Sequence, residues 1–372
     1  ADSAIRIEME DVEFDNNLTT FGIRVTGTAT DLGTAEQTLA GEQPYSLIAW
    51  GRLGAPGLLL APDARSGGNG SALVRVIHVG LAAVTVDVYV TAPDDNLDDF
   101  GPNFGGVGSG QTTIGLRLSP GTYRVRSAIS GSKVVIYDSG TVELVENTSI
   151  NLLFYTLQSA SLLQCMVLPV SGSGAGAVVA TNRVSALKVV NAALNAGTID
   201  GFFDGTKFVD DIPYALATAY LFQTAGAHTL TFEATSTAGA AIASLQQTLE
   251  STSDISVLVV GFPGAVQAIA FADDNLVPLA GACRVRFVNA SSDNAAYDVY
   301  VGDTKQVSAL AARTASDYVT LVPATYTFTF RDPASGATVL AVADQAIGEG
   351  RVATLYLAGA VGQLSSIVST DR

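Results

Sequence analysis

The chain has 372 residues, of which 48% are hydrophobic, only 15% are charged and 37 are glycine. This composition excludes a disordered chain and predicts a folded, turn-rich protein of roughly two to four domains. The formal net charge of −16 creates a negative field that disfavours nucleic acid and anionic lipid as partners.

The first residues predict export and a strand. The chain opens with Ala-Asp-Ser, which cleavage at an A-x-A-type signal site would leave behind, so we expect a mature, secreted protein. Residues 3–14, SAIRIEMEDVEF, begin by alternating apolar and polar side chains as a strand does. Their apolar members are Ile5, Ile7, Met9, Val12 and Phe14.

An internal repeat organises the rest of the chain. The segments 73–90, 186–203 and 283–301 superimpose: in each, a polar residue ends an apolar strand and an aspartate follows nine residues later. The polar residues are His78, Asn191 and Asn289, and the aspartates are Asp87, Asp200 and Asp298.

Two further landmarks follow in every copy. A turn and an alternating strand carry Tyr123, His228 or Tyr326 in one slot. A late apolar strand comes next, at 149–156, 254–261 and 352–359, followed by a turn and a last strand.

Short strands with period-two alternation, turn residues between them and no helical period predict an all-β fold of small antiparallel, immunoglobulin-like sandwiches. We expect four tandem modules, the first incomplete, joined at 62–70, 171–182 and 273–281 and largely independent of one another. Their expected ranges are 1–66 (module one), 67–171 (module two), 182–275 (module three) and 281–372 (module four).

Two uncharged stretches resemble membrane spans in length. Residues 150–182 contain several serines and glutamines, and residues 255–272 are interrupted by Gly261, Pro263 and Gly264. Both are better explained as pairs of buried strands, so no membrane span is expected.

The repeated aspartates argue against an enzyme. A catalytic acid is needed once, whereas this aspartate occupies the same slot of three modules, so we interpret it as a hydrogen-bonding structural residue. Lys207 and Lys305 follow in repeated hairpin turns and are interpreted as solvated turn residues. His78 and His228 lack the further ligands of a zinc site, and no Ser-His-Asp set is evident.

Module two has eight extra residues in the loop 92–110. Its carboxylates are hard oxygen ligands of the kind that calcium prefers, although not in EF-hand spacing; an acidic, solvated loop is the alternative. The candidate ligands are Asp94, Asp95, Asp98 and Asp99. No other cofactor is expected.

The two cysteines leave three possibilities open. Cys165 and Cys283 can be free core thiols, an intrachain bond if module three folds back, or an interchain bond between neighbouring subunits. Four sequons permit glycosylation, at Asn17, Asn69, Asn147 and Asn289.

The repeat itself resembles a known family. VRVIHVGLAAVTVDVYV, then LSPGTYRVR and INLLFYT, recurs as VRFVNASSDNAAYDVYV and LVPATYTFTF. These stretches resemble the DUF4397-type domain of unknown function, a family of secreted prokaryotic Ig-like repeats. The resemblance covers modules two and four well and module three more loosely, where IDGFF replaces Asp-Val-Tyr-Val. It implies an exported, often tandem, cell-surface protein and carries over no catalytic residues.

Module one departs from the repeat. Complete modules place about 42 to 50 residues before the aromatic slot, but Phe21 has 20, so the first and the Asp-bearing strands have no room. The resulting groove and unpaired edges need a cover. Module two can pack over the gap, residues 3–14 can fold back locally, or another copy can supply the strand.

The sequence therefore predicts a non-enzymatic extracellular structural subunit that polymerises head to tail with copies of itself into a filament or surface layer. Other cell-surface components are further possible partners. The alternative is a monomeric adhesin or ligand-binding protein that uses the module-two loop with calcium.

Overall fold

The computed structural model describes residues 18–24, 27–40, 43–52, 55–63, 68–81, 84–157, 161–171, 176–293 and 295–372. The regular elements of this part of the chain are strands and two short 3-10 helices, η1 (Leu97–Asp99) and η2 (Thr235–Thr237), which confirms the all-β class. None of its helices has the length and apolar character needed to cross a bilayer. The predicted assembly strand, residues 3–14, and the sequon at Asn17 lie outside the described residues.

Module two is built from two facing sheets. One has the strand order β14-β13-β12-β5-β8, with β9 also pairing β5, and the other has the order β11-β10-β6-β7. The strands are β5 (Ala72–His78), β6 (Val86–Thr91), β7 (Phe104–Val107), β8 (Gln111–Thr112), β9 (Leu116–Leu118), β10 (Gly121–Ile129), β11 (Val135–Leu144), β12 (Ser149–Thr156), β13 (Leu163–Ser171) and β14 (Val178–Ala180).

Module three repeats this plan. Its sheets have the orders β18-β15-β22-β23, with β19 also pairing β15, and β17-β16-β20-β21. The strands are β15 (Val184–Ala193), β16 (Ile199–Phe203), β17 (Thr206–Ile212), β18 (Leu216–Ala217), β19 (Leu221–Thr224), β20 (Gly226–Ala234), β21 (Ala241–Leu249), β22 (Asp254–Gly261) and β23 (Gln267–Asp273).

Module four has two four-stranded sheets, with the orders β27-β24-β30-β31 and β26-β25-β28-β29. The strands are β24 (Cys283–Ser291), β25 (Tyr297–Val301), β26 (Thr304–Leu310), β27 (Val319–Leu321), β28 (Ala324–Arg331), β29 (Thr338–Ile347), β30 (Val352–Gly359) and β31 (Ser365–Thr370).

The expectation of purely antiparallel sandwiches is wrong at one place in each of the three complete modules. The first strand runs parallel to the late strand in the pairs β5–β12, β15–β22 and β24–β30. Side-chain alternation has period two in either direction, so the sequence pattern contained no information about this polarity.

Each complete module has its own core between its two sheets. Alternate residues of the paired strands point inward, such as Val74 and Phe154 in module two, and Phe287 and Leu355 in module four. Module three does the same with Val189, Phe232 and Val257. The apolar alternation of the sequence thus reports the core faces correctly.

The described part of module one contains two separate ladders. Strand β1 (Leu18–Arg24) pairs only with β2 (Asp31–Thr38), and β3 (Tyr45–Arg52) pairs only with β4 (Ala55–Pro62). The two ladders face each other closely, since a Cβ at Gly33 of β2 would lie 2.6 Å from the carbonyl oxygen of Pro56 in β4. We call these four strands the half-module.

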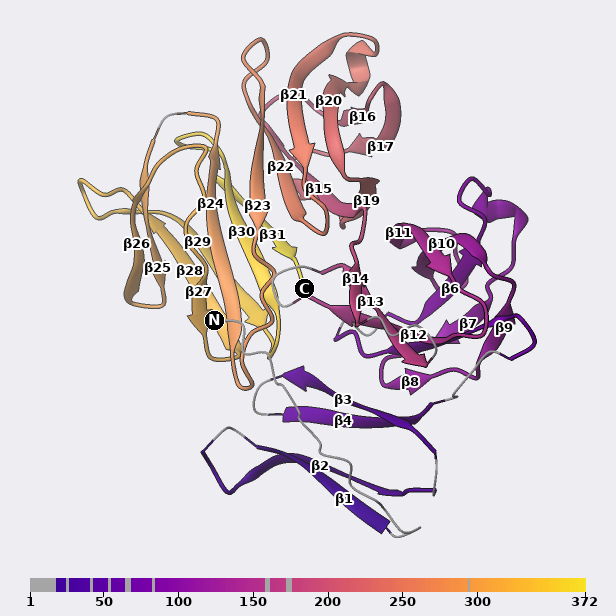
Figure 1. Ribbon diagram of the computed structural model, residues 1–372. Coiled ribbons are helices and arrows are strands. Elements are labelled where there is room, and N and C mark those ends of the chain that lie inside the picture. The colour runs from indigo at the N-terminus through magenta and orange to yellow at the C-terminus, as the bar shows by residue number, and fades with distance from the viewer. Residues whose placement is uncertain are drawn as a thin grey trace.

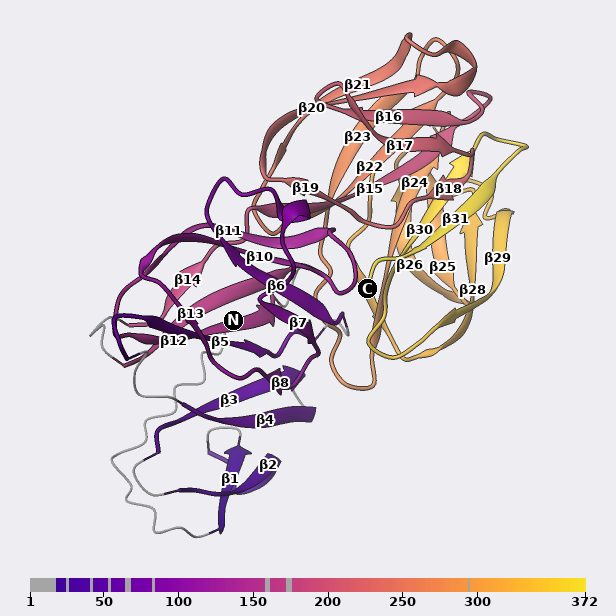
Figure 2. The ribbon, with the colours of Figure 1, turned by 90° about the vertical axis from the view of Figure 1, so that its right-hand side faces the viewer.

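The expectation of largely independent modules is wrong, because outer sheet faces pack together (Figures 1 and 2). Ile48 of the half-module is buried with Ile77 of module two, against Leu153 and Tyr155. Modules three and four bury a second outer-face cluster: Val190, Ala192, Leu258, Val260, Val288, Ala290, Tyr356, Ala358 and Ile367. The joint 171–182 is partly structured as well, because it contains β14 and the fully buried Asn182.

Candidate functional site

The repeated aspartates stabilise a backbone irregularity on the neighbouring strand. In each module the Oδ1 atom accepts the N–H of a residue with positive φ on the neighbouring strand, a conformation that costs energy for most residues. The pairs are Asp87 with Gly106 (2.7 Å, φ 65°), Asp200 with Asp211 (2.8 Å, φ 52°) and Asp298 with Ala309 (2.8 Å, φ 46°). These contacts are those of structural residues.

Lys207 and Lys305 are exposed, as expected of solvated turn residues, and each also pairs with the repeated aspartate of its module. The Lys207 ammonium lies 2.9 Å from Asp200, and Lys305 forms an ion pair with Asp298. The contact with Lys305, followed by the Ala309 N–H, holds the pKa of Asp298 below its ordinary value. This ion pair could not be predicted from the sequence, because the register of the hairpin decides which side chains face each other. Neither residue type indicates that register.

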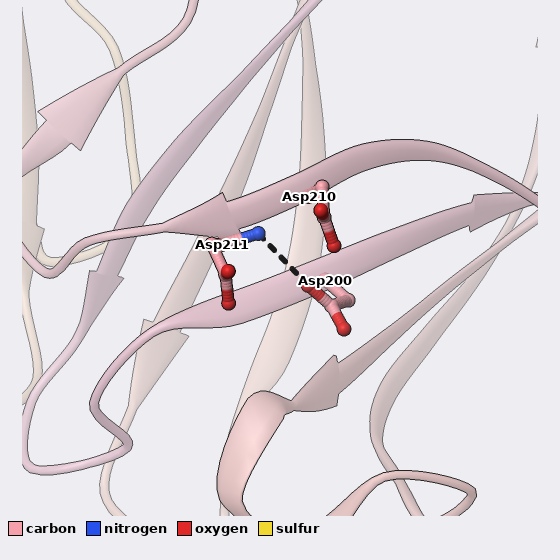
Figure 3. Close-up of side chains that lie close together, drawn as sticks. All are labelled: Asp200, Asp210 and Asp211. Atoms are coloured by element: carbon pink, nitrogen blue, oxygen red, sulfur yellow. Dashed lines mark hydrogen bonds between the residues drawn. The ribbon is translucent and has the colours of Figure 1, made fainter.

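Three carboxylates meet in module three, at Asp200, Asp210 and Asp211 (Figure 3). Lys207 already bridges two of them, since its Nζ also lies 2.7 Å from Asp210. The Lys207 ammonium therefore already neutralises part of the negative charge that a metal ion would otherwise meet.

The calcium prediction for module two is not supported by the geometry. Asp95 accepts the Ala92 N–H at 2.9 Å, and Asn96 caps η1 by accepting the Asp98 N–H. Within the described residues, the carboxylates of Asp94, Asp95, Asp98 and Asp99 do not converge on one point as the module-three group does. The side-chain oxygens of Asp95 and Asn96 are used in local turns instead.

The slot shared by His78, Asn191 and Asn289 closes the turn after the first strand. Asn289 accepts the Ser291 N–H and donates to the carbonyls of Ala295 and Leu310. Asn191 makes the equivalent bonds, and His78 accepts the Gly80 N–H and bonds the Val84 carbonyl. All three side chains are fully buried.

Burial decides between the predicted glycosylation sites. Asn289 is 0% exposed and its amide is fully used, so this sequon cannot accept a glycan in the folded protein. Asn69 and Asn147 lie exposed in neighbouring turns, where the Asn147 Oδ1 accepts the Gly70 N–H at 3.0 Å. These two remain predicted sites.

The aromatic slot also has a structural contact. The Tyr123 hydroxyl donates to the carbonyl of Ser119 at 3.0 Å, four residues earlier, and Tyr326 donates to Val322 in the same way. His228 reproduces the contact through Nε2 and the Thr224 carbonyl. One geometry thus explains why the slot takes either residue type.

The cysteines lie in separate cores. Cys165 is 1% exposed in module two and Cys283 is 0% exposed in module four, and both are free thiols. Burial raises the pKa of each thiol. This placement favours free core thiols over the interchain bond, because neither sulfur reaches the surface.

The half-module corresponds to one part of a complete module. Strands β3 and β4 match the late and last strands β12 and β13, and β1 and β2 match β10 and β11. In module two the other edges of β12 and β10 are covered by β5 and β6. Among the described residues, no strand covers those edges of β3 and β1.

A buried ionic contact that sequence reasoning missed joins the modules in pairs. In modules one, three and four, a late-strand hydroxyl donates at 2.5 Å to an aspartate that ends the last strand. These pairs are Ser46–Asp63, Ser256–Asp273 and Thr354–Asp371. Each aspartate also binds a first-strand base of the adjacent module, namely Arg75 to Asp63, Arg286 to Asp273 and Lys188 to Asp371. We call this set the clasp.

A sequence signal for the clasp exists. Each base stands three residues before the His or Asn slot, and each acid ends an apolar strand, as in LLLAPD and AIAFAD. The spacing could not predict which acid each base contacts, because Lys188 and Asp371 are 183 residues apart.

Two buried aspartates show how the clasp compensates charge. Burial alone would raise the pKa of Asp273, but Lys188 and Arg286 outweigh it and hold that pKa below its ordinary value. At Asp254, in the joint of modules two and three, burial outweighs the hydrogen bonds donated by Asn275 and Ser161 and raises the pKa to about 6.

These observations define an all-β protein of repeated modules whose recurring polar residues maintain the fold. The chain belongs to the family described as a domain of unknown function, DUF4397, whose model matches residues 185–296 and 284–372. The match covers modules three and four, so the expectation that module three fits the family more loosely than module two is wrong. Module two carries the eight-residue loop expansion, which modules three and four lack.

No curated protein matches the chain. Among solved structures, the carbohydrate-binding module CBMbc of Eubacterium rectale Amy13K, in complex with maltoheptaose, is 10% identical and aligns over 54% of this chain and 96% of its own, with a TM-score of 0.18. The fimbrial anchor protein Mfa2 of Porphyromonas gingivalis is 8% identical over 77% and 90%, with a TM-score of 0.14. Both scores are too low for any function to be transferred.

Proposed function

We propose that the protein is a non-enzymatic, extracellular structural subunit that assembles with copies of itself by strand complementation of the half-module. One observation carries the proposal. In module two, β6 covers one edge of β10 and β5 covers one edge of β12; the equivalent edges of β1 and β3 are uncovered within the described residues. An uncovered sheet edge presents N–H and C=O groups that another chain can pair.

The complete modules specify what the β3 edge accepts. In all three, the strand at this edge runs parallel to the late strand, with Arg75 opposite Asn151 and Arg286 opposite Thr354. A strand added to β3 in the same register runs parallel to it and places a basic residue opposite Ser46. A donor strand for β3 must therefore pair in parallel and carry a basic residue at the position opposite Ser46.

The interior of the half-module supports the same conclusion. Leu47 is only half-buried, whereas Leu152 and Leu355 at the equivalent positions are each 1% exposed. Leu58 and Leu60 on β4 are half-buried as well. A donor strand with apolar side chains would cover these leucines and gain roughly 25 cal/mol for each Å² removed from water.

Residues 3–14 match this requirement in sequence. Ile5-Arg6-Ile7 has the order of Val74-Arg75-Val76 in β5 and Val285-Arg286-Phe287 in β24. Pairing in that register would turn the isoleucines toward Leu47 and place Arg6 on the clasp face, near Asp63. When each copy donates to the next one instead of exchanging strands reciprocally, the contact is head to tail and does not close, so it produces filaments.

Deletion of residues 1–14 tests the assembly. Fibres seen by electron microscopy and pelleted by centrifugation should disappear, while the remaining chain keeps its β-type circular dichroism. As a matched pair of variants, Ile5→Asp with Ile7→Asp should stop assembly, and Glu8→Gln with Glu10→Gln should leave it unchanged. Native-looking fibres from the truncated chain would exclude the donor strand.

A crosslinking experiment separates donation between copies from local folding back. Ile7→Cys and Leu47→Cys are placed on different chains, mixed, and treated with a short bis-maleimide. Donation in trans predicts a crosslinked dimer from the mixture. Crosslinks that form only when both substitutions are on one chain would show that the segment completes its own half-module and that assembly uses another surface.

A further inference from the structure

The two histidines of the chain differ in what their ring nitrogens face. The Nδ1 atom of His78 accepts the Gly80 N–H at 3.2 Å, and its Nε2 atom lies 3.2 Å from the Val84 carbonyl oxygen. A neutral ring satisfies both contacts when its one proton is on Nε2. Burial also lowers the pKa of His78, so this ring stays in the neutral form.

His228 faces acceptors on both sides. Its Nδ1 atom lies 2.7 Å from a carboxylate oxygen of Asp204, and its Nε2 atom lies 3.0 Å from the Thr224 carbonyl oxygen. Asp204 is ionised at neutral pH, because hydrogen bonds from the Thr229 N–H and from His228 hold the pKa of Asp204 below its ordinary value. Both contacts are therefore hydrogen bonds only when both ring nitrogens carry a proton, in the imidazolium form.

This contact joins three elements of module three (Figure 1). His228 lies on β20, Thr224 ends β19, and Asp204 opens the turn between β16 and β17. The Phe203 ring packs on the imidazole with a centroid distance of 4.3 Å, and the residue opposite on β21 is the uncharged Gln247. Within the described part of the chain, Asp204 is the one carboxylate that pairs with the ring, so it is the group that responds to the ring's charge.

Module four lacks both partners at the equivalent place. Tyr326 occupies the aromatic slot there, and Gly302 occupies the position of Asp204. The Gly302 N–H bonds to the Thr327 carbonyl at 3.1 Å, as the Asp204 N–H bonds to the Thr229 carbonyl at 2.9 Å. The left-handed backbone of this turn suits glycine, yet module three has Asp204 there with a φ of 48°. Module three thus differs from module four at two facing positions, and the two differences together create the ion pair.

We infer that the pair of His228 and Asp204 is a proton-dependent latch on the β16–β17 hairpin. The charged ring holds the turn of this hairpin onto β19 and β20. When the ring loses its proton, one nitrogen presents a lone pair to an acceptor oxygen, and the attraction is replaced by repulsion. The Asp204 side chain is 50% exposed and can turn into water, whereas the His228 side chain is 12% exposed and stays packed. Because β17 is the edge strand of its sheet, the released hairpin has a sheet neighbour on one side only.

The sign of the pH dependence follows from the charged form of the ring. The latch contributes fully below about pH 6.5, where histidine is protonated in an unfolded chain as well. Its contribution is lost as pH rises and the folded ring gives up its proton. A rise in pH through the neutral range therefore loosens this hairpin and leaves its counterpart in module four closed.

Amide hydrogen exchange of the full chain, followed by NMR at about pH 6 and about pH 8.5, tests the latch. After correction for the intrinsic exchange rate, the Asp204 and Thr229 amides should lose protection by about threefold or more at the higher pH. The Gly302 amide is the control within the same chain and should not change, which separates the latch from any change in global stability.

Two substitutions assign the effect to the ring. His228→Tyr installs the residue that module four has in this slot and does not titrate in this range, so protection at Asp204 should be equal at both pH values. An equal loss of protection in the wild type and in His228→Tyr, or no loss in the wild type, would overturn the latch.

The ring nitrogens themselves give a second measurement, because labelled histidine yields only two sets of ring signals in this chain. Asp204→Asn keeps an acceptor for the Thr229 N–H but removes the negative charge. In this variant His228 should lose its proton at a pH lower by about half a unit or more than in the wild type, while His78 stays neutral in both. An unchanged midpoint for His228 in Asp204→Asn would show that the two side chains do not form an ion pair.

Discussion

The half-module and module four share an outer face but differ in their interior. Ser46–Asp63 and Thr354–Asp371 are the same hydroxyl–carboxylate pair, and each aspartate receives a base from the adjacent module. Inside, Leu47 is half-buried whereas Leu355 is 1% exposed. The late and last strands are therefore sufficient to build the face that joins modules. The first strand and the Asp-bearing strand are needed to close the core.

Breaking the clasp should give the largest effect. Asp371→Ala would leave the Lys188 ammonium, whose side chain is 1% exposed, without its closest partner, and we expect a loss of about 3–5 kcal/mol in unfolding free energy. Asp63→Ala should cost less, about 1–3 kcal/mol, because Arg75 is 11% exposed and nearer to water. Urea unfolding of the full chain measures both.

Asp317→Ala serves as the control for this pair, since Asp317 is an exposed acid of module four. Its change should stay within about 0.5 kcal/mol. Equal losses for Asp371→Ala and Asp317→Ala would mean that the clasp does not hold modules three and four together.

Truncating equivalent leucines measures the difference between the interiors. Leu355→Ala should cost about 2–5 kcal/mol because it opens a cavity in a closed core. Leu47→Ala should cost only about 1 kcal/mol in the unassembled protein, because part of this side chain is already in water. If a donor strand covers Leu47 in the fibre, the same substitution should destabilise fibres more than monomers; an identical effect on both would argue against coverage.

The joint between modules two and three should respond to pH in the opposite sense to a paired acid. Asp254 has its pKa raised from 3.8 to about 6, so the folded protein binds the proton more tightly than the unfolded chain. Stability should therefore increase as pH falls from above 6 towards 4, by at most about 3 kcal/mol. Asp254→Asn should flatten this slope in urea titrations between pH 4 and 8, and a slope that survives would assign it to another group.

The Asp-bearing hairpin of module four, which has no counterpart in the described half-module, should contribute least. Because the pKa of Asp298 is lowered, its contribution exists above about pH 4 and is lost as pH falls through that lowered value. Asp298→Asn should cost about 1 kcal/mol or less at pH 7, since Lys305 is 41% exposed and the amide can still accept the Ala309 N–H. Asp303→Asn, on the exposed turn, is the control.

The sequence predicted what repeats along the chain and missed what depends on pairing in space. The aspartate and aromatic slots were evident because Asp87, Asp200 and Asp298 recur at a fixed spacing. The ion pair of Lys305 was missed because it depends on the register of a hairpin, and the clasp because Lys188 meets Asp371 only after two modules have packed. The calcium site stays a prediction, and the described carboxylates of the module-two loop do not converge on one point.

The parallel pairing of first and late strands has a consequence for how the chain is made. Arg286 and Thr354 lie opposite each other in β24 and β30 but are 68 residues apart. At ribosomal rates of roughly 5–20 residues per second, the first strand waits several seconds for its partner to be synthesised. Throughout that interval its edge is open to a neighbouring nascent chain as well as to its own. Strand exchange between chains is therefore a competing outcome of biosynthesis for the three complete modules, and crowding on one polysome should favour it.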